Sequence, residues 1–291
     1  MSTSNKHHYL PEFYLKGFVN EAGQFSIFDY KKNSIKKGEY FPSTHFFEKG
    51  RNLLNLKGEK TDFIEQIYSI KDERYSKLLK LIQSSDSAPN LDSIQLLTLQ
   101  DFVSNLFWRI PKNDTLYEEQ FKENPLISKA YKIVDAETKE ELHDQITEKI
   151  KTSKEFKKGL RVTASDFLHM AHNTDDLHNW RIGYSTSSLH LCSDNPLILK
   201  NEIAKDIFKT EFIFPLTKNH LLFRSFNNLK IKVLPAEYSL MIDLIIFKQG
   251  ELFCASSRKD YLTTMSTIAC NYDIARLKNK VFNYLDKSTS G

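Results

Sequence analysis

The sequence predicts an α+β fold built as a single domain, and three observations carry this prediction. Apolar residues recur at helical spacing through the middle of the chain, from about residue 61 to residue 109. Short segments that alternate apolar and polar residues lie on both sides of that helical part. The 291 residues, of which 40% are hydrophobic, are enough to bury a substantial core. Strands at both ends around a helical middle are typical of the α+β class.

The first element expected is a short helix after the N-terminal histidines. Pro11 suits its first turn, and Gly17 suits a left-handed residue near its end. Residues 24–30 alternate as a half-buried strand does, and a turn at residues 31–34 follows. Residues 39–47 are then expected to supply the partner strand. The N-terminal segment is therefore predicted to be a helix followed by a hairpin.

Two long helices are expected next. The first starts near Thr61, and a serine-rich loop at residues 84–89 separates it from the second. Asp92 can cap the second helix, because its side chain accepts hydrogen bonds from free N–H groups of the first turn. That helix is expected to end at Arg109, since Pro111 disfavours helical backbone at the residue before it.

Residues 113–160 are strongly charged, with an acidic part followed by a basic part. We expect exposed helices here, forming a lid or an insertion. The charges are typical of a solvated face. The basic part could instead follow a phosphate backbone, but Phe156 is the only aromatic residue interleaved with it.

The C-terminal half is predicted to hold an antiparallel or mixed sheet, because four short segments rich in strand-forming residues are separated by turn residues. A helix, a further strand and a final helix from about Lys259 are expected to follow. These segments are 180–184, 189–192, 211–214 and 221–224 for the first four strands, 236–247 for the helix and 251–255 for the last strand.

Composition excludes several classes of function. The net charge of +4 permits an anionic partner without requiring one. With nine glycines and no glycine-rich phosphate loop, dinucleotide fingerprint or Gly-x-Ser-x-Gly elbow, no cofactor is expected. Three widely spaced cysteines indicate reduced thiols rather than a disulfide framework. The polar start of the chain and its short apolar runs predict a cytoplasmic protein without a membrane partner.

Several blocks of the chain resemble one family in the expected order. Residues 6–18 read Lys-His-His-Tyr-Leu-Pro-Glu-Phe-Tyr-Leu-Lys-Gly-Phe, and residues 102–111 form a helix ending in Arg-Ile-Pro. A Trp-Arg-Ile segment begins at Trp180, Ser-Asp-Asn-Pro spans residues 193–196, and Phe-Pro-Leu-Thr spans residues 214–217. These blocks resemble the DUF4238 family, which is named for its unknown function, so the resemblance implies a shared fold without a mechanism.

The chain departs from the pattern of that family at two places. Residues 189–192 read Leu-His-Leu-Cys, where an apolar run ending in Thr or Ser is more usual. Asp243 stands where Asn is expected from the resemblance.

Four residues are the candidates for catalysis. His7 and His8 precede a helix N-terminus, which favours anions, so one of them could act as acid or base; a local hydrogen-bonding role is the alternative. Asp194 follows a strand and could orient a histidine or bind a cation, although a turn before proline explains it equally. Arg109 could present its guanidinium to a phosphate, or could pair with a carboxylate such as Asp194 as a structural lock.

Substrate contacts are expected from residues beside these candidates, and a metal site is a weaker alternative. No metal is predicted at the main site. Asp166, His169 and His172 share a helical face and could hold zinc, although the spacing is not that of the helical zinc-protease motif. The residues assigned to substrate binding are Lys6, Tyr9, Trp180, Ser193 and Asn195.

Two functions remain open from the sequence. The first is a cofactor-free hydrolase or transferase that acts on a phosphate-bearing substrate, either a nucleic acid or a phosphorylated small molecule. A nuclease-like toxin or phage-defence effector would fit that chemistry. The second is a binding or interaction module without catalysis, in which the same polar residues form a network that specifies the fold.

Overall fold

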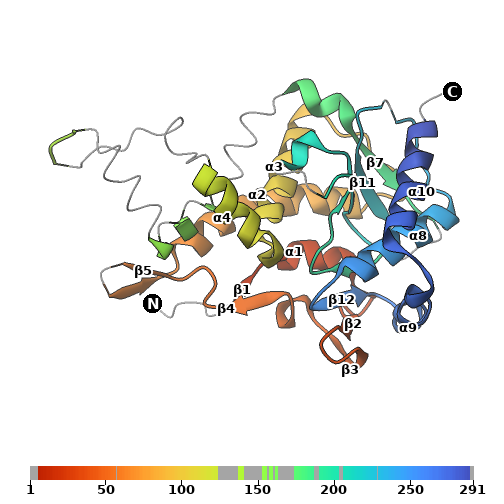
Figure 1. Cartoon of the computed structure of the whole chain (residues 1–291), viewed down its shortest axis with the longest axis horizontal. Helices are drawn as coiled ribbons and strands as arrows, with labels where there is room; N and C mark the ends of the chain where they lie inside the picture. The colour runs from red at the N-terminus through yellow and green to blue at the C-terminus, as the bar shows by residue number, and fades with distance from the viewer. Residues whose placement is uncertain are drawn as a thin grey trace.

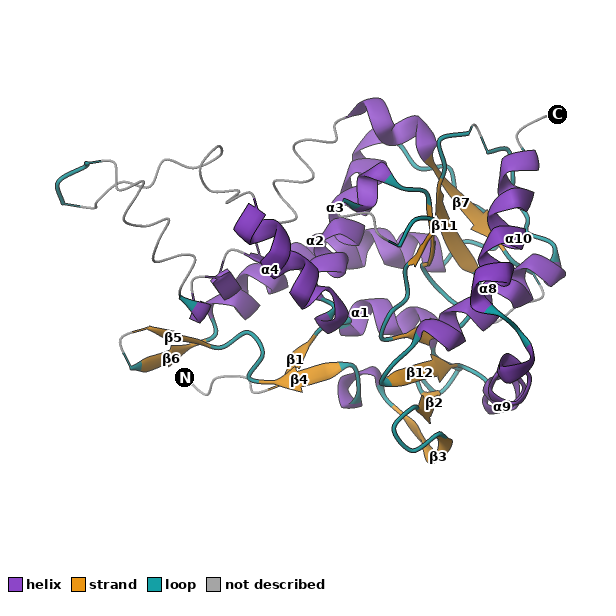
Figure 2. Ribbon diagram, viewed as in Figure 1, coloured by secondary structure: helices purple, strands orange, loops and turns teal. Residues whose placement is uncertain are grey.

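The computed structural model describes residues 6–56, 58–123, 137–140, 153–155, 157–159, 161–162, 174–186, 190–202, 206–227 and 229–288. Within these ranges, helices combine with small antiparallel sheets (Figures 1 and 2), so the α+β prediction is confirmed.

The N-terminal histidines lie in a strand rather than in a free extended segment. β1 (Lys6–His8) pairs antiparallel with β4 (Phe47–Lys49), and α1 (Glu12–Leu15) follows. The prediction that residues 39–47 form the partner of the first long strand is wrong in its bounds. β2 (Phe25–Asp29) pairs with β3 (Ser34–Tyr40), which begins five positions earlier. The partner ends at residue 40 because a 3₁₀ turn that starts at a proline occupies residues 42–44.

Gly17 is required for space and not for a left-handed backbone. Its φ is not among the positive values found for other glycines, so the predicted left-handed helix end is wrong. A Cβ atom at this position would lie 3.1 Å from the carbonyl oxygen of Leu216 and 3.3 Å from Thr217 Cα. The Gly17 carbonyl also accepts a hydrogen bond of 2.9 Å from the N–H of Lys218. Gly17 therefore lets the N-terminal turn contact the C-terminal sheet directly.

The two long helices form where the sequence predicts them. α2 (Phe63–Gln83) and α3 (Ser93–Arg109) are separated by the expected loop. The Asp92 side chain accepts from the N–H of Gln95, whose side chain accepts in turn from the N–H of Asp92, which makes a complete capping box. α4 (Asp114–Glu123) starts the charged segment. Most of residues 124–160 lie outside the described ranges, so the lid or insertion stays a prediction.

One of the two larger sheets joins the two ends of the chain. Its strand order is β3-β2-β12-β8, so the N-terminal hairpin pairs with a C-terminal strand. The other has the order β7-β11-β10-β9 and is antiparallel, as one of the predicted alternatives has it. Its fourth strand is β9 and not the predicted segment 189–192, because Cys192 lies in β8 and pairs with β12. A separate hairpin is formed by β5 (Leu54–Leu56) and β6 (Glu59–Thr61). The remaining bounds are β7 (Trp180–Tyr184), β8 (Cys192–Ser193), β9 (Ile198–Leu199), β10 (Phe212–Pro215), β11 (His220–Arg224) and β12 (Phe253–Ser256).

Both larger sheets lie between two apolar cores. On β2, Phe25 and Ile27 belong to the core that includes α2 and α3, whereas Phe28 belongs to the core on the opposite face. The second core is built from α8 (Ala236–Gln249), α9 (Lys259–Ile268) and α10 (Ile274–Lys287), which Figure 1 shows together on one side. Because side chains alternate along a strand, β2 is buried on both faces and not half-buried as predicted.

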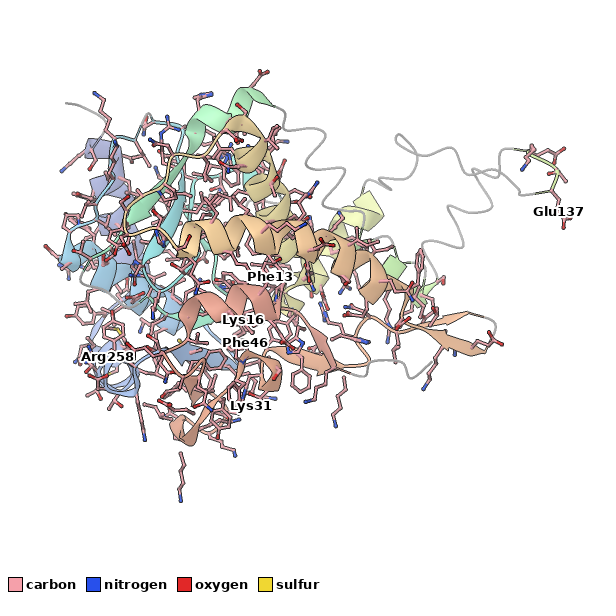
Figure 3. The ribbon with its side chains drawn as sticks, turned by 180° about the vertical axis from the view of Figure 1, so that it is seen from behind. Phe13, Lys16, Lys31, Phe46, Glu137 and Arg258 are labelled. Atoms are coloured by element: carbon pink, nitrogen blue, oxygen red, sulfur yellow. The ribbon has the colours of Figure 1, made fainter. Side chains whose placement is uncertain are left out.

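Aromatic side chains fill the first core around α1. Phe13 contacts Phe102 with a distance of 5.7 Å between ring centroids, and Phe46 contacts Phe25 at 6.2 Å. Figure 3 shows Phe13 and Phe46 among densely arranged side chains, whereas the exposed Lys31 and Arg258 lie at the periphery. The N-terminal block is thereby fixed to the sheet by large apolar contacts.

His45, between β3 and β4, is held as a neutral imidazole. Its Nε2 accepts from the Lys36 ammonium at 2.8 Å, and Nδ1 lies 2.8 Å from the Thr44 hydroxyl, which itself donates to a carbonyl. Burial lowers the pKa of His45 to about 4 from the ordinary 6.5, and the Lys36 charge adds to the shift.

We therefore expect His45 to make the folded state acid-sensitive. A depressed histidine pKa means that the unfolded state binds more protons, so this stability is present above pH 6.5 and is lost as pH falls toward about 4. Urea unfolding across that window should show a smaller pH dependence for His45→Phe than for the wild type. The exposed His178 serves as control, since His178→Ala should keep the wild-type slope. Equal slopes for wild type and His45→Phe would contradict the assignment.

Candidate functional site

The adjacent histidines of β1 point to opposite sides, as the period of a strand requires. His7 is fully buried, and its Nδ1 accepts a hydrogen bond of 2.8 Å from the backbone N–H of Asn52. The Asn52 side chain in turn donates to Glu65 of α2 at 2.5 Å. His7 therefore anchors β1 to the turn at residues 50–53.

His8 faces the start of α1. Its Nε2 is buried and has no hydrogen-bond partner within the described part of the chain; the nearest carboxylate oxygen is Glu12 Oε1 at 3.9 Å. Burial lowers the pKa of His8 below its ordinary value, while Glu12 opposes this shift and Arg109 adds to it. A neutral imidazole with one uncommitted nitrogen can accept or donate a proton.

Arg109, at the end of α3, contacts the histidine block through the backbone. Its Nη2 donates to the His8 carbonyl at 3.3 Å, and its Nη1 forms an ion pair with Asp72 of α2 at 2.7 Å. The guanidinium also lies over the Tyr68 ring, with Cζ 4.1 Å from the centroid. The expected pairing with a carboxylate is therefore present, but the carboxylate is Asp72 and not Asp194.

Two further arginines join this region, and we call Arg51, Arg109 and Arg161 the arginine cluster. Arg51 binds Asp114 with two hydrogen bonds, of 3.0 and 2.6 Å, and Arg161 lies 2.9 Å from the same carboxylate. All three act electrostatically on Tyr68, whose pKa burial raises while they lower it. The cluster is thus a concentration of positive charge balanced by nearby carboxylates.

Sequence reasoning missed Arg51 and Arg161, which share the carboxylate of Asp114, and the Tyr68 ring under Arg109. Tyr68 and Asp72 are four residues apart on α2, so their common face was readable from the sequence. Nothing in the sequence indicates that residues 51 and 161 meet at Asp114, because that contact joins segments more than forty residues apart on each side.

Asp194 lies in the turn after β8, and its carboxylate accepts hydrogen bonds from backbone N–H groups. Its Oδ1 accepts from Glu251, Leu252 and Phe253 at 3.1, 3.0 and 2.9 Å. Burial raises the pKa of Asp194, and these hydrogen bonds oppose the shift. Asp194 thereby holds the turn that leads into β12. In the described part of the chain it forms no hydrogen bond or ion pair with His8 or Arg109.

The residues assigned to substrate binding are divided between two regions. Near β1, Lys6 Nζ lies 5.1 Å from the Phe47 ring centroid, and the Tyr9 hydroxyl is buried without a hydrogen-bond partner among the described residues. Burial raises the pKa of Tyr9, as does the charge of Asp194. The other three residues make structural contacts. Ser193 bonds the Asn195 carbonyl, the Asn195 amide donates to Gln249, and Trp180 donates to Asp176.

The two departures from the family pattern lie in contact with each other. His190 Nδ1 and Asp243 Oδ1 are 3.0 Å apart, and both side chains are completely buried. Asp243 also accepts from the N–H of Leu191 at 3.1 Å and from the Tyr261 hydroxyl at 2.6 Å. A histidine in the apolar run is thus matched by a carboxylate on α8.

The alternative metal site cannot be placed. Asp166, His169 and His172 lie outside the described residues. Within the described ranges, no group of three or more His, Cys, Asp or Glu side chains could hold a metal ion. Zinc binding at residues 166–172 stays a prediction from sequence.

A family model described as a protein of unknown function, DUF4238, matches residues 6–259. The chain belongs to this family. The match in DUF4238 begins at β1 and ends at the first residue of α9, so α10 lies beyond it. No curated protein and no solved structure matches the chain. Among the described residues, no helix combines the length and apolar character needed to cross a bilayer.

Two of the sequence blocks compared above with DUF4238 contact each other at the candidate site. The block that opens the chain meets the Arg-Ile-Pro block through the bond between Arg109 and the His8 carbonyl. The Ser-Asp-Asn-Pro block instead supports the turn before β12. His8 and Arg109 are therefore the pair on which a chemical proposal can be built.

Proposed function

We propose that this DUF4238 member is a hydrolase or transferase that acts on a phosphate-bearing substrate at the arginine cluster, with His8 as its acid–base group. The observation that carries the proposal is the uncommitted Nε2 of His8, on a residue whose backbone carbonyl accepts from Arg109 and whose imidazole pKa the Arg109 charge lowers. Guanidinium groups match the geometry of phosphate oxygens and stabilise the charge of a phosphoryl transition state.

The proposed reaction is a displacement at phosphorus. The neutral imidazole of His8 removes a proton from the attacking water or hydroxyl, whose oxygen forms the new P–O bond. The bond to the leaving oxygen breaks, that oxygen takes a proton from solvent, and the protonated His8 later returns its proton to solvent. The carboxylate nearest the reactive Nε2 is Glu12, whose Oε1 lies 3.9 Å away and outside hydrogen-bond distance. Since Nε2 is covered, the substrate must displace Glu12, whose side chain is 44% exposed.

His8→Gln is expected to lower the rate by about 10²–10⁴-fold, the range typical of a lost general acid or base. Purified protein and the variant should be incubated with labelled RNA, DNA and nucleotides, with and without divalent metals. His178→Gln is the matched control, because His178 is exposed and should leave the rate unchanged. Intact substrates throughout, from protein with a normal thermal transition, would refute the proposal.

A non-catalytic interaction module is the second candidate, and one observation favours it. Each arginine of the cluster already has a carboxylate partner, as a network that specifies a fold would require. The same experiment separates the two. The interaction module is supported if His8→Gln lowers the melting temperature and the wild-type protein turns over no phosphate compound.

A further inference from the structure

A second region of the molecule, which shares no residue with the arginine cluster, contains a cavity of about 340 Å³. Three segments bound it: residues 88–91 before α3, residues 180–182 of β7, and residues 229–232. This volume is near the lower end of the range for small-molecule pockets. A ligand of modest size is therefore the occupant to consider.

The cavity opens onto the outer edge of a sheet, where β7 is bridged to Val233 at Tyr184 and Ile182 lies outside that bridge. β7 is the first strand in the order β7-β11-β10-β9, and Figure 1 shows it beside β11. The N–H of Tyr184 donates to the carbonyl of Lys232, away from β11. Because backbone groups alternate along a strand, the N–H and C=O of Ile182 point the same way, toward the cavity. They form a donor and an acceptor on one residue.

The lining combines an apolar floor with positive charge. Its charged residues are Arg181, Lys230 and Lys232, and no carboxylate contributes to it. Lys232 is exposed and forms no ion pair with any described residue. The apolar members are Leu91, Leu96, Ile182, Leu229 and Ile231.

We propose that this cavity binds a nucleoside monophosphate. A nucleobase is flat and largely apolar on its faces, and its edge carries adjacent donors and acceptors that match the N–H and C=O of Ile182. The phosphate then lies at the rim, where Lys230 and Lys232 supply charge. No glycine-rich loop is needed, because side-chain ammonium groups contact the phosphate. The site is independent of the proposed chemistry at His8.

Calorimetric titration of the full chain with the four common ribonucleoside monophosphates tests this proposal. At least one should bind roughly tenfold or more tightly than its nucleoside and than ribose 5-phosphate, since base and phosphate are both recognised. Binding should weaken with salt, because the phosphate contacts are exposed. The bound nucleotide should also raise the melting temperature.

Three variants separate binding in the cavity from general charge effects. Lys232→Glu should weaken binding by about tenfold or more, whereas Lys37→Glu, an exposed charge reversal on β3, should not. Leu91→Trp should abolish binding by filling the cavity without changing charge. Absence of binding at millimolar nucleotide, equal losses in both lysine variants, or equal affinity for nucleoside and nucleotide would each overturn the proposal.

Discussion

Asp194→Ala is expected to destabilise the folded chain by about 2–4 kcal/mol, because three backbone N–H groups lose their shared acceptor. Residues 251–253 are only partly buried, so water can replace some of these bonds. The turn into β12 should loosen, and with it the pairing of β12 with β2 and β8.

Asp194→Asn provides the sharper comparison. Its amide oxygen keeps one acceptor at nearly the same position, so the loss should be about 1 kcal/mol. Asp86→Ala, at an exposed loop position, is the control and should change little. Melting temperature and urea unfolding measure all three. An Asp194→Ala variant as stable as the wild type would return Asp194 to the list of catalytic candidates.

Asp243→Ala should cost more, about 3–5 kcal/mol, because it leaves buried partners without their acceptor. His190, the N–H of Leu191 and the Tyr261 hydroxyl all bond this one carboxylate. Since His190 and Asp243 are fully buried, water cannot substitute easily.

The pair also predicts strong non-additivity. His190→Leu combined with Asp243→Asn removes the imidazole and the charge together. The new amide oxygen can still accept from the N–H of Leu191, and the amide NH2 group can donate to the Tyr261 hydroxyl oxygen. The double variant should therefore be more stable than the sum of the single losses by about 1 kcal/mol or more. A double-mutant cycle from urea unfolding measures this coupling. Additive losses would show that the two residues act separately.

Local signals predicted the helices well. The capping box at Asp92 and Gln95 and the proline after Arg109 are sequence-near features, so the bounds of α3 follow from them. The pairing of β1 with β4 could not be predicted in this way. Its register depends on forty residues that fold between the two strands, and no short-range pattern specifies it.

The same limit on prediction from local sequence applies to the candidate site. The sequence named His8 and Arg109 as candidates, but it did not predict the hydrogen bond between Arg109 and the His8 carbonyl, which joins residues 101 positions apart. The partners of Asp194 could not be predicted either, because they are backbone N–H groups, which nearly every residue type carries. Arg109 pairs with Asp72 and not with Asp194. Tyr68 and Asp72 are four residues apart on α2, so the helix presents both to the Arg109 guanidinium.

The pairing of β2 with β12 has a consequence for synthesis of the chain. Residues 26–29 pair with β3 on one side, but their partner on the other side is at residues 253–256, so this sheet cannot close until those residues have left the ribosome. Until then, the edge of β2 that β12 later covers has its hydrogen-bonding groups open to other chains. Contacts this distant in sequence also slow folding. A nascent chain of this protein is therefore the form most exposed to aggregation and most dependent on chaperones.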